Sequence, residues 1–417
     1  MTSCLPFIKD ALYSYMAIPE FFQPLIDSVP LQRLRRVRQL AGTEYVYPGA
    51  THTRFEHSLG VMHLAGELCD ILNINAEKEG KIPLISKQDK KSIMAAGLLH
   101  DIGHGPFSHV FEKLYEDQHK NHEDITNWLI KTVLEDTILS MDLDPRYLMQ
   151  LATGNQTDSN TYFKSQIIAG TIDCDSLDYL VRDSYYTGAV VGSLDVQRIM
   201  LMTKVLDGNL AFDVKIGVPI IEGYFLFRLN SFKQIYFHKT SRSAQIMIYN
   251  ALENKKDEFN LGVFDKPDDF LKWDDYTLWT TIQPDPFIQK LKKRQILKMV
   301  YESGNLESGK SNTQLTYKDI AKYEADIAAE AKVSEKDVFI DTPYLPTVPY
   351  AHATSFDPED IPIFEIQDKG IIIQKLSELS VFFSLIKGYY NIVRVYTWEE
   401  NRDKVGKVAK QILDNVL

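Results

Sequence analysis

Apolar residues recur at helical spacing in several segments of the chain. Between residues 54 and 72, four side chains follow one another at intervals of four, three and four residues, as in the buried stripe of an amphipathic helix. These are His57, Val61, Leu64 and Leu68. A histidine therefore lies at one end of a stripe that is predicted to face the protein core.

Two further predicted helices carry polar residues on an apolar face. Residues 86–101 bring His100 onto such a face, and residues 161–185 bring Asp175 onto another. Their companions are Ile93, Ala96 and Gly97 in the first helix and Ile168, Ile172 and Tyr179 in the second. A buried carboxylate without a partner is unstable as an ion, so a cation is the natural partner for Asp175 and for Asp101, which follows His100.

The rest of the first 253 residues is also predicted to be mainly helical. Helices are expected at 19–41 and 219–252, a loop at 43–53 and a hairpin around an Asp-Gly turn at 204–216. Between two helices, Gly103, Gly105 and Pro106 break the pattern. His104 is thus expected in a tight loop and His109 in a first helical turn, where backbone N–H groups favour an anion.

Beyond residue 253 the pattern is less regular. Residues 254–336 are more charged and predict short helices, and a closing helix is expected at 399–416. Between them lie the strand-like runs IPIFEIQ, GIIIQKLSELS and NIVRVYTW, around a short helix. The predicted fold is mostly α, with a helical core and small β-hairpin (1–253), a helical connecting region (254–336) and a smaller α+β C-terminal part (337–417).

Composition narrows the function classes. Hydrophobic residues make up 44% and charged residues 25% of the 417, which is ordinary for a soluble globular protein. No run approaches the roughly 18 apolar residues of a membrane span, and three scattered cysteines (Cys4, Cys69 and Cys174) fit a reducing cytoplasm. A net charge of −11 makes nucleic acid an unexpected partner. The cluster Arg33, Arg35, Arg36 and Arg38 is either a local anion site or a solvated helix face.

The histidines are concentrated in one region. Eight of the ten lie within residues 52–122, and they are His52, His57, His63, His100, His104, His109, His119 and His122. A lone histidine on an apolar face is usually a core residue whose hydrogen bonds are satisfied by its neighbours, and Asp175 alone could cap a helix. The convergence of three predicted inward faces beside further histidines favours a metal-centred hydrolase site.

Two imidazoles and two carboxylates suit a catalytic divalent cation with open coordination positions. The ligands on this interpretation are His57, His100, Asp101 and Asp175, and the metal is open among iron, manganese, magnesium, zinc and cobalt. Such a cation activates water and offsets charge on a phosphoryl oxygen. His104, His109 and His122 have an ordinary pKa near 6.5, which suits proton donation to a leaving group.

Three stretches of sequence resemble a known family. The order His57, His100-Asp101, Asp175 is similar to the metal signature of the HD phosphohydrolase superfamily. The flanking text PLQRLRRVRQLAGTEYVYPGATHTRFEHSLGVMHLAG, AAGLLHDIGHGPFSHVFE and IDCDSLDYLVRDSYYTG resembles its deoxynucleoside triphosphate (dNTP) triphosphohydrolase branch. Triphosphohydrolases of this type can carry an additional sterile-alpha-motif domain. We do not expect that domain here, because the match begins at about residue 8. The resemblance is dense to about residue 250.

The resemblance implies a role for each matching residue. The metal ligands would be the four named above, and the catalytic residues would be His104, His109, His122 and Glu112, the last in place of an aspartate. Glu112 lies one turn after His109 and is expected to orient that imidazole and raise its pKa. The substrate-binding residues would be Arg54 and Arg228 on phosphates, Gln39 and Asp183 on the sugar 3′-hydroxyl, Tyr179 at the sugar edge, and Tyr236.

Three departures from the family pattern change what is expected. Ser176 stands where the family has a phosphate-binding lysine, and Phe232 stands where it has a histidine. KDALYSY replaces an Asp-Pro-x-His-Gly run that belongs to an effector site and subunit contacts. Asp27, Gln32 and Arg35 do match residues that read a guanine effector, so that site is half preserved.

The leading hypothesis is a cytoplasmic, metal-dependent hydrolase that cuts dNTPs at the α-phosphate into a deoxynucleoside and inorganic triphosphate. A guanine-nucleotide effector and a homo-oligomer, dimer or tetramer, are expected from the resemblance. One alternative is a related phosphohydrolase acting on a nucleoside monophosphate, a cyclic nucleotide or another phosphoester. The other is a nucleotide sensor that does not turn over.

Overall fold

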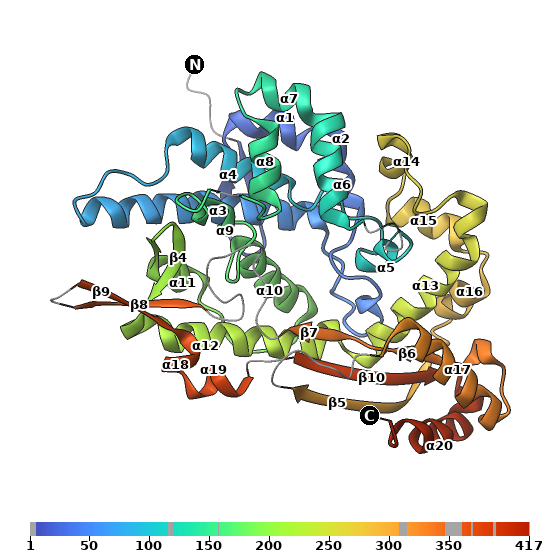
Figure 1. Cartoon of the computed structure of the whole chain (residues 1–417). Helices are drawn as coiled ribbons and strands as arrows, with labels where there is room; N and C mark the ends of the chain where they lie inside the picture. The colour runs from blue at the N-terminus through green and yellow to red at the C-terminus, as the bar shows by residue number, and fades with distance from the viewer. Residues whose placement is uncertain are drawn as a thin grey trace.

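The computed structural model describes residues 6–115, 118, 120–156, 158–307, 315–346, 361–367, 370–386 and 389–416. Within these ranges the protein is mostly helical, with two four-stranded sheets at one side (Figure 1). The predicted fold class is therefore confirmed.

Three helices form the centre of the molecule: α3 (Arg54–Lys78), α4 (Lys87–Leu99) and α10 (Cys174–Thr187). Helix α3 packs against both of the others, and α8 (Pro145–Ala152) covers α4. The starts of α3 and α4 are fixed by capping boxes, in which Thr53 and Ser86 each exchange hydrogen bonds with the acidic residue three positions later. Both helices agree with the spacing of apolar residues in the sequence.

The helix predicted over 19–41 was wrong as a single element. The segment forms the 3₁₀ turn Glu20–Phe22, α1 (Gln23–Ile26), α2 (Val29–Arg33) and a 3₁₀ turn at Leu34–Arg36. Pro24 and Pro30 each lie in the first turn of a new short helix, and Ser28 between the helices is extended. Because proline has no N–H to donate, each proline favours a helix start over a helix interior.

The helix predicted over 161–185 was also wrong in part. It consists of α9 (Phe163–Gln166) and α10, separated by an irregular stretch. Asp173 caps α10 by accepting a hydrogen bond from the N–H of Ser176, at 2.7 Å. Ile168 and Ile172 therefore do not share a helix with Asp175, although Asp175 does point inward from the first turn of α10.

Between α4 and α9 the chain forms α5 (His109–Glu112), α6 (His122–Leu129), a π-helical turn (Ile130–Leu134) and α7 (Glu135–Ser140). After α10 come α11 (Val196–Met202) and the predicted hairpin, β3 (Thr203–Leu206) and β4 (Asn209–Asp213). Asp207 and Gly208 in its turn both have positive φ, 47° and 75°, as a type I′ turn requires.

The helix predicted over 219–252 is confirmed but interrupted. It consists of α12 (Val214–Ser231), a π-helical turn (Phe232–Tyr236) and α13 (Lys239–Phe259). The predicted short helices then follow as α14 (Pro267–Leu271), α15 (Asp275–Ile282), α16 (Pro286–Lys292) and α17 (Tyr317–Ala331). The ten-residue strand β5 (Lys298–Glu307) lies among them and was not predicted.

The C-terminal strands join two different sheets. The strands β8 (Pro362–Gln367) and β9 (Gly370–Lys375) extend the hairpin into a sheet of order β3-β4-β8-β9. In the other sheet β10 (Tyr389–Thr397) pairs with β5, with β6 (Phe339–Asp341) and with β7 (Tyr344–Pro346). The domain boundaries inferred from the sequence stay predictions.

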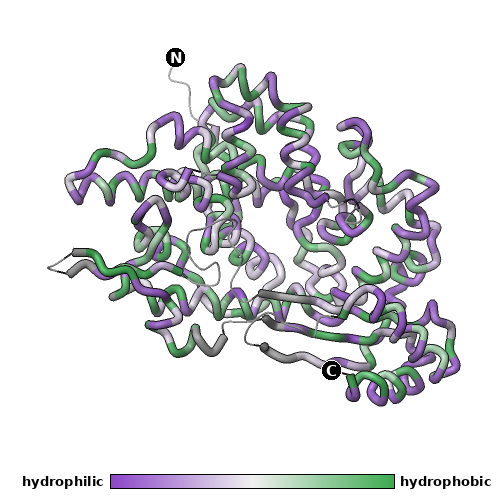
Figure 2. Tube along the Cα trace, in the orientation of Figure 1, coloured by the Kyte–Doolittle hydropathy of each residue, from purple (hydrophilic) through white to green (hydrophobic). Residues whose placement is uncertain are grey.

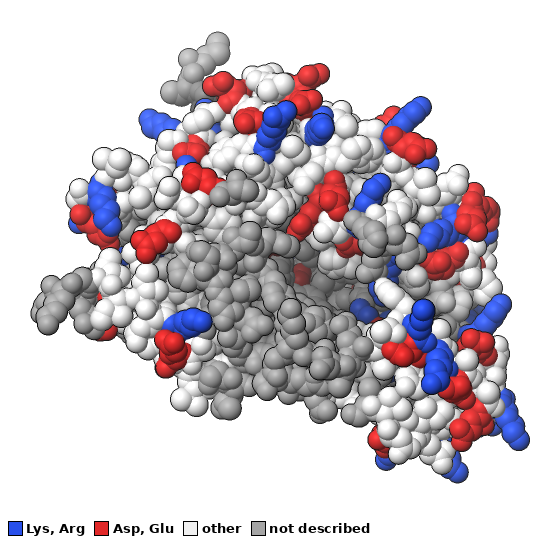
Figure 3. Space-filling view, in the orientation of Figure 1, with Lys and Arg blue, Asp and Glu red and all other residues white. Residues whose placement is uncertain are grey.

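Short helices α18 (Leu376–Leu379) and α19 (Val381–Ile386) follow β9, and the closing helix α20 (Arg402–Leu413) packs with α17 against the second sheet (Figure 1). A small hairpin, β1 (Phe7–Asp10) and β2 (Ser14–Ala17), begins the described chain. Apolar and polar residues alternate along most helices (Figure 2), and the buried apolar ones form a core between the packed elements. On the face seen in Figure 3, acidic and basic side chains are interspersed over the described residues. Among the described residues no helix combines the length and apolar character needed to cross a membrane.

Candidate active site

The four predicted metal ligands come together at the meeting point of α3, α4 and α10. His57 lies in the first turns of α3, His100 and Asp101 follow directly after α4, and Asp175 lies in the first turn of α10. The Nε2 of His57 is 3.0 Å from Asp175 Oδ1 and 3.7 Å from Asp101 Oδ2. The Nε2 of His100 is 3.4 Å from Asp101 Oδ1 and 3.5 Å from Asp175 Oδ1. One ligand atom from each of His57, His100 and Asp101 lies within 4.8 Å of the others, and Asp175 Oδ1 approaches both imidazoles from α10.

Contacts at Nδ1 fix the orientation of both imidazoles. His57 Nδ1 lies 2.7 Å from Asp178 Oδ2, and His100 Nδ1 lies 2.8 Å from the carbonyl oxygen of Gly97. Both Nε2 atoms are buried and make no well-aligned hydrogen bond among the described residues, although each lies close to the carboxylate of Asp175. Metal-binding histidines are typically held in this way, with one nitrogen bonded to the protein and the other left for the metal. The donor set and its orientation fit a divalent cation.

The electrostatics of the centre favour positive charge at this point. Burial lowers the pKa of His57, but the carboxylates of Asp175 and Asp178 outweigh burial and raise the pKa to about 10. The pKa of His100 is also raised, because Asp101 and Asp175 outweigh the burial that lowers it. Burial raises the pKa of Asp175, and the two imidazoles bring it well below its ordinary value. A bound cation supplies the same charge that these carboxylates attract.

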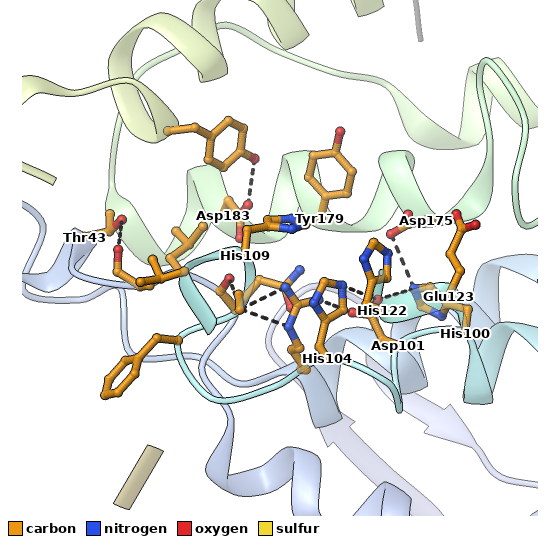
Figure 4. Close-up of a pocket in the computed structure, with 18 of the residues that line it drawn as sticks. Thr43, His100, Asp101, His104, His109, His122, Glu123, Asp175, Tyr179 and Asp183 are labelled. Carbon is orange, nitrogen blue, oxygen red and sulfur yellow. Dashed lines mark hydrogen bonds and ion pairs between the residues drawn. The ribbon is translucent and has the colours of Figure 1, made fainter. Parts of the chain in front are cut away.

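A second group of histidines lies beside the ligands. The rings of His104 and His122 are stacked, with centroids 4.0 Å apart, and His109 lies edge-on to both, 5.1 and 5.7 Å away. His104 Nε2 is 3.4 Å from Asp101 Oδ1, so this cluster adjoins the metal centre. The histidines at 104, 109 and 122 are thus brought together as the sequence predicted (Figure 4).

Glu112 connects two of these histidines. Its Oε2 is 2.9 Å from His109 Nδ1, and its Oε1 is 3.1 Å from His122 Nδ1 and accepts the backbone N–H of His122 at 3.0 Å. Burial lowers the pKa of His122, but Glu112 outweighs it and raises the pKa. In contrast, burial, Arg54 and His122 bring the pKa of His104 well below its ordinary value. Within this cluster, the surroundings of His122 favour its protonated form and those of His104 favour its neutral form.

The loop that carries His104 is held by its neighbours. The hydroxyl of Thr126, on α6, accepts the N–H of Gly103 at 3.0 Å and donates to the carbonyl of His100 at 2.9 Å. A Cβ on Gly103 would lie 2.1 Å from the carbonyl oxygen of His122, so a glycine is required there. The buried Arg33 of α2 donates to the carbonyl of His104 at 2.9 Å. These contacts fix the histidine loop against α6 and α2.

These groups line a cavity of about 480 Å³, a size that suits a small organic ligand. Figure 4 shows the histidines, Asp101 and Asp175 on one side of it and Asp183 and Tyr179 further along α10. Predicted site residues that line it are Gln39, Arg54, His100, Asp101, His104, His109, His122, Asp175, Tyr179, Asp183 and Tyr236. His57, Glu112 and Arg228 are not among the lining residues.

The two predicted phosphate-binding arginines have different surroundings. Arg54 is buried, pairs with Asp101 and donates to the hydroxyl of Ser108 from Nε and Nη2, at 3.1 and 2.9 Å. Arg228 is also buried, and its guanidinium lies 4.8 Å from the ring centroid of Phe232. The phenylalanine that replaces the family's histidine therefore packs against this cation. Of these two arginines, Arg54 lines the cavity and Arg228 is not among the lining residues.

The predicted sugar-binding residues cluster at the other end of the cavity. Asp183 is buried and accepts the hydroxyl of Tyr236 at 2.6 Å, while its other oxygen is 2.6 Å from His52 Nε2. The side-chain oxygen of Gln39 is buried without a hydrogen-bond partner among the described residues. Tyr179 and Tyr236 lie with their rings 6.3 Å apart. This end thus offers acceptor oxygens beside aromatic rings.

The predicted effector residues lie outside this cavity. Gln32 donates to the carbonyl of Ile26 at 2.8 Å and accepts from Arg35 Nε at 3.0 Å, and Arg35 also lies over the ring of Phe55. Asp27, on the preceding turn, accepts from Gln23 at 2.8 Å. The three are neighbours near α1 and α2, and their effector role stays a prediction.

Ser176 does not take the place of the missing lysine. Its N–H donates to Asp173, and its hydroxyl is 3.0 Å from the hydroxyl of Tyr224 on α12. The side chain is therefore bonded to the neighbouring helix, and this position supplies no cation to the cavity.

Sequence reasoning missed several residues that support the site. Asp178 holds His57, His52 holds Asp183, and the hydroxyl of Ser108 holds Arg54. Asp178 could have been found from its spacing, because it lies three residues after Asp175 on the same helix. The other contacts join segments far apart in the chain, and Ser108 lies in the left-handed region at φ 52°, which nothing in its sequence context signals.

Comparison with known proteins shows that two family profiles match the chain. A profile described as the HD domain matches residues 54–182, and one described as the HD associated region matches residues 194–415. A relative named deoxynucleoside triphosphate triphosphohydrolase SAMHD1 homolog, from Dictyostelium discoideum, is 34% identical over 309 residues, covering 70% of this chain and 58% of the relative. This chain therefore spans less than two thirds of that relative's length.

Two solved structures match nearly the whole chain. A hypothetical protein from Aquifex aeolicus has a TM-score of 0.77 at 26% identity and covers 97% of this chain and 100% of its own. A phosphohydrolase from Bacteroides thetaiotaomicron has a TM-score of 0.73 at 26% identity, with 95% and 100% covered. The arrangement of helices and sheets is thus shared along the whole of both chains.

Proposed function

The chain belongs to the HD-domain family, and on that premise we propose that it is a metal-dependent phosphohydrolase that cleaves dNTPs at the α-phosphate. The observation that carries the proposal is the pair of buried Nε2 atoms on His57 and His100, which face the carboxylates of Asp101 and Asp175 and make no well-aligned hydrogen bond among the described residues. The name of the Dictyostelium relative supports the choice of substrate.

In this proposal, His57, His100, Asp101 and Asp175 would hold a divalent ion, and that ion would supply water activation and charge stabilisation on a phosphoryl oxygen. The reaction adds water across the bond between the α-phosphorus and the 5′-oxygen, and it yields a deoxynucleoside and inorganic triphosphate. One proton must reach the departing 5′-oxygen.

The histidine cluster supplies that proton. His122 is the better donor because Glu112 favours its protonated form, and because its side chain is 25% exposed whereas that of His109 is 72% exposed. With Nδ1 held by Glu112, the Nε2–H of a protonated His122 remains to donate. His109 is the alternative donor.

Other residues position the substrate. Arg54 offsets charge on the α-phosphate from its place beside Asp101. The role of Arg228 on the phosphates rests on the family resemblance, because it does not line the cavity. Gln39 and Asp183 bind the 3′-hydroxyl, and a substrate without this hydroxyl would leave the buried side-chain oxygen of Gln39 without a partner among the described residues. Tyr179 lines the sugar edge, where a ribose 2′-hydroxyl would have the least room.

Two observations favour a second candidate, a phosphohydrolase of nucleoside monophosphates or other phosphoesters. Ser176 adds no cation, and the lining residues include two arginines, Arg54 and Arg242, each paired with an aspartate. The acidic lining residues are Asp101, Glu123, Asp173, Asp175 and Asp183. This balance suits a substrate with fewer negative charges than a triphosphate.

Product analysis decides between the two. The purified protein is incubated with each dNTP, with Mn²⁺ or Mg²⁺, in water enriched in ¹⁸O, and products are separated by anion exchange. Intact triphosphate that carries the label, with an unlabelled deoxynucleoside, supports attack at the α-phosphorus. Stepwise release of phosphate, or turnover of a deoxynucleoside monophosphate alone, supports the second candidate.

Effector control and assembly need their own measurement. We propose that Asp27, Gln32 and Arg35 bind a guanine nucleotide and that the protein is a homo-oligomer. The same assay with and without GTP, alongside light scattering, tests both. Activity and mass that are unchanged by GTP, in the wild type and in Gln32→Ala alike, would exclude the effector site.

A further inference from the structure

The amino-terminal hairpin β1–β2 reaches the metal centre through a buried chain of charges. Asp178 Oδ2 is 2.7 Å from His57 Nδ1, and Arg182 donates to both oxygens of Asp178, at 2.8 and 2.9 Å. The other end of that guanidinium donates to Asp10 Oδ2 at 2.8 Å. Asp10 is the last residue of β1, far from the ligands in the sequence.

A second contact from the same hairpin ends on the same carboxylate. The hydroxyl of Tyr13, in the hairpin turn, donates to Asp178 Oδ1 at 2.8 Å. The turn is itself shaped by Asp10, whose Oδ1 accepts the N–H groups of Leu12 and Tyr13 at 2.8 and 3.1 Å. One residue, Asp10, therefore both forms the turn that presents Tyr13 and anchors Arg182.

The chain of charges is closed to water. The side chains of Asp178 and Arg182 are 0% exposed and that of Asp10 is 3% exposed. Buried charges of this kind are costly unless each is fully paired. Two carboxylates against one guanidinium leave a net negative charge behind His57, and such a charge strengthens an imidazole as a metal ligand.

We propose that Asp10 and Tyr13 are positioning residues of the metal centre: they hold Asp178, which holds His57 with its Nε2 turned toward the cation. The inference rests on the metal site of the proposed function. It assigns a role in metal binding to a hairpin that contributes no ligand and does not line the cavity.

Conservative variants separate this role from a general effect on folding. Tyr13→Phe removes one hydroxyl, and Asp10→Asn keeps the oxygen that shapes the turn while it loses the carboxylate that faces Arg182. Asp178→Asn removes the charge behind His57. Tyr15→Phe is the matched control, because Tyr15 lies on β2 of the same hairpin, is 67% exposed and does not contact Asp178 among the described contacts.

The experiment is titration of the metal-free full-length protein with Co²⁺ or Mn²⁺. Binding is measured by calorimetry and, for Co²⁺, also by the visible absorption of the bound ion. We expect Asp178→Asn to weaken metal binding by about 10- to 100-fold and Tyr13→Phe and Asp10→Asn by about fivefold each. Tyr15→Phe should bind as the wild type does.

The thermal midpoint of each metal-free variant is measured in parallel. A fall in the midpoint with unchanged metal affinity in Tyr13→Phe and Asp10→Asn would overturn the inference, since the hairpin would then be structural only. Unchanged affinity in Asp178→Asn would overturn it as well. If the wild type itself binds no divalent ion, the metal site of the proposed function fails first, which is a distinguishable result.

Discussion

Gly60 provides a sharp test of how tightly the metal centre is built. It lies on α3 one turn after His57, where Asp178 and Arg182 of α10 approach the helix. A Cβ at this position would lie 2.0 Å from Asp178 Oδ1, 2.6 Å from Arg182 Nη2 and 2.7 Å from Asp178 Cγ. Gly60→Ala therefore forces the carboxylate that holds His57 to move by more than an ångström.

The expected cost can be worked out from these contacts. Overpacking a tight interior costs about 1–3 kcal/mol, and separating a buried ion pair costs about 3–5 kcal/mol, whereas alanine in place of glycine gains about 0.5–1 kcal/mol in a helix. We expect Gly60→Ala to lower the free energy of unfolding by about 3–7 kcal/mol. The same displacement should weaken metal binding.

The assay is urea unfolding of the metal-free protein with linear extrapolation, followed by metal titration. Gly223→Ala is the matched control, since Gly223 also lies within a helix, α12, but no described atom lies within 4 Å of its added Cβ. We expect that variant to be equal to or slightly more stable than the wild type. If Gly60→Ala unfolds within about 0.5 kcal/mol of Gly223→Ala and binds metal equally well, the tight packing of Asp178 against α3 is refuted.

Three further predictions address the cavity. His100→Ala removes a metal ligand and should lower kcat/KM at least about a hundredfold, with metal content falling in parallel by elemental analysis; normal turnover would contradict the metal site. Burial lowers the pKa of His122 and Glu112 raises it by more, so the proton donor is kept at low pH and lost as the pH rises through that pKa. Glu112→Gln should therefore move the alkaline limb of the kcat/KM profile to lower pH, and an unmoved limb would count against His122 as the acid. Tyr236→Phe removes the 2.6 Å hydrogen bond to Asp183 and should raise KM for a dNTP about fivefold, with a smaller change in kcat; an equal loss for a 3′-deoxy analogue would argue against a sugar contact.

The inward positions of His57 and His100 were predictable because local pattern and burial agree on α3 and α4. The apolar spacing in these two segments correctly placed both histidines on inward faces, and capping boxes begin the helices where the pattern predicted them to start. For Asp175, the prediction of an inward position relied on a helix over 161–185 that does not exist as one element. The helix that carries Asp175 is α10, which begins after the cap at Asp173. The aspartate points inward because that cap places it in the first turn, and the residues before it belong to an irregular stretch.

Other elements depend on contacts that no local pattern contains. The strand β5 reads KMVYESGNLE, which has weak alternation, and it becomes a strand because β10 pairs along its length from residues 389 to 397. The contact of Tyr13 with Asp178 spans 165 positions. Such pairings are set by the tertiary fold, so the hairpin's approach to the metal centre could only be seen in the structure.

A single helix, α10, organises most of the site, and its sequence shows why. Asp175, Asp178, Tyr179, Arg182 and Asp183 follow one another at intervals of three, one, three and one, so they form a stripe along the helix. Three charged members of this stripe are buried: Asp178 and Arg182 are 0% exposed and Asp183 is 1% exposed. Local rules would place such residues in solvent, and a consistent sequence breaks those rules mainly at functional sites. One edge of the stripe, Asp175, Tyr179 and Asp183, lines the cavity and includes the proposed metal ligand. The other edge, Asp178 and Arg182, supports His57, so a rotation of α10 would disturb metal and substrate binding together.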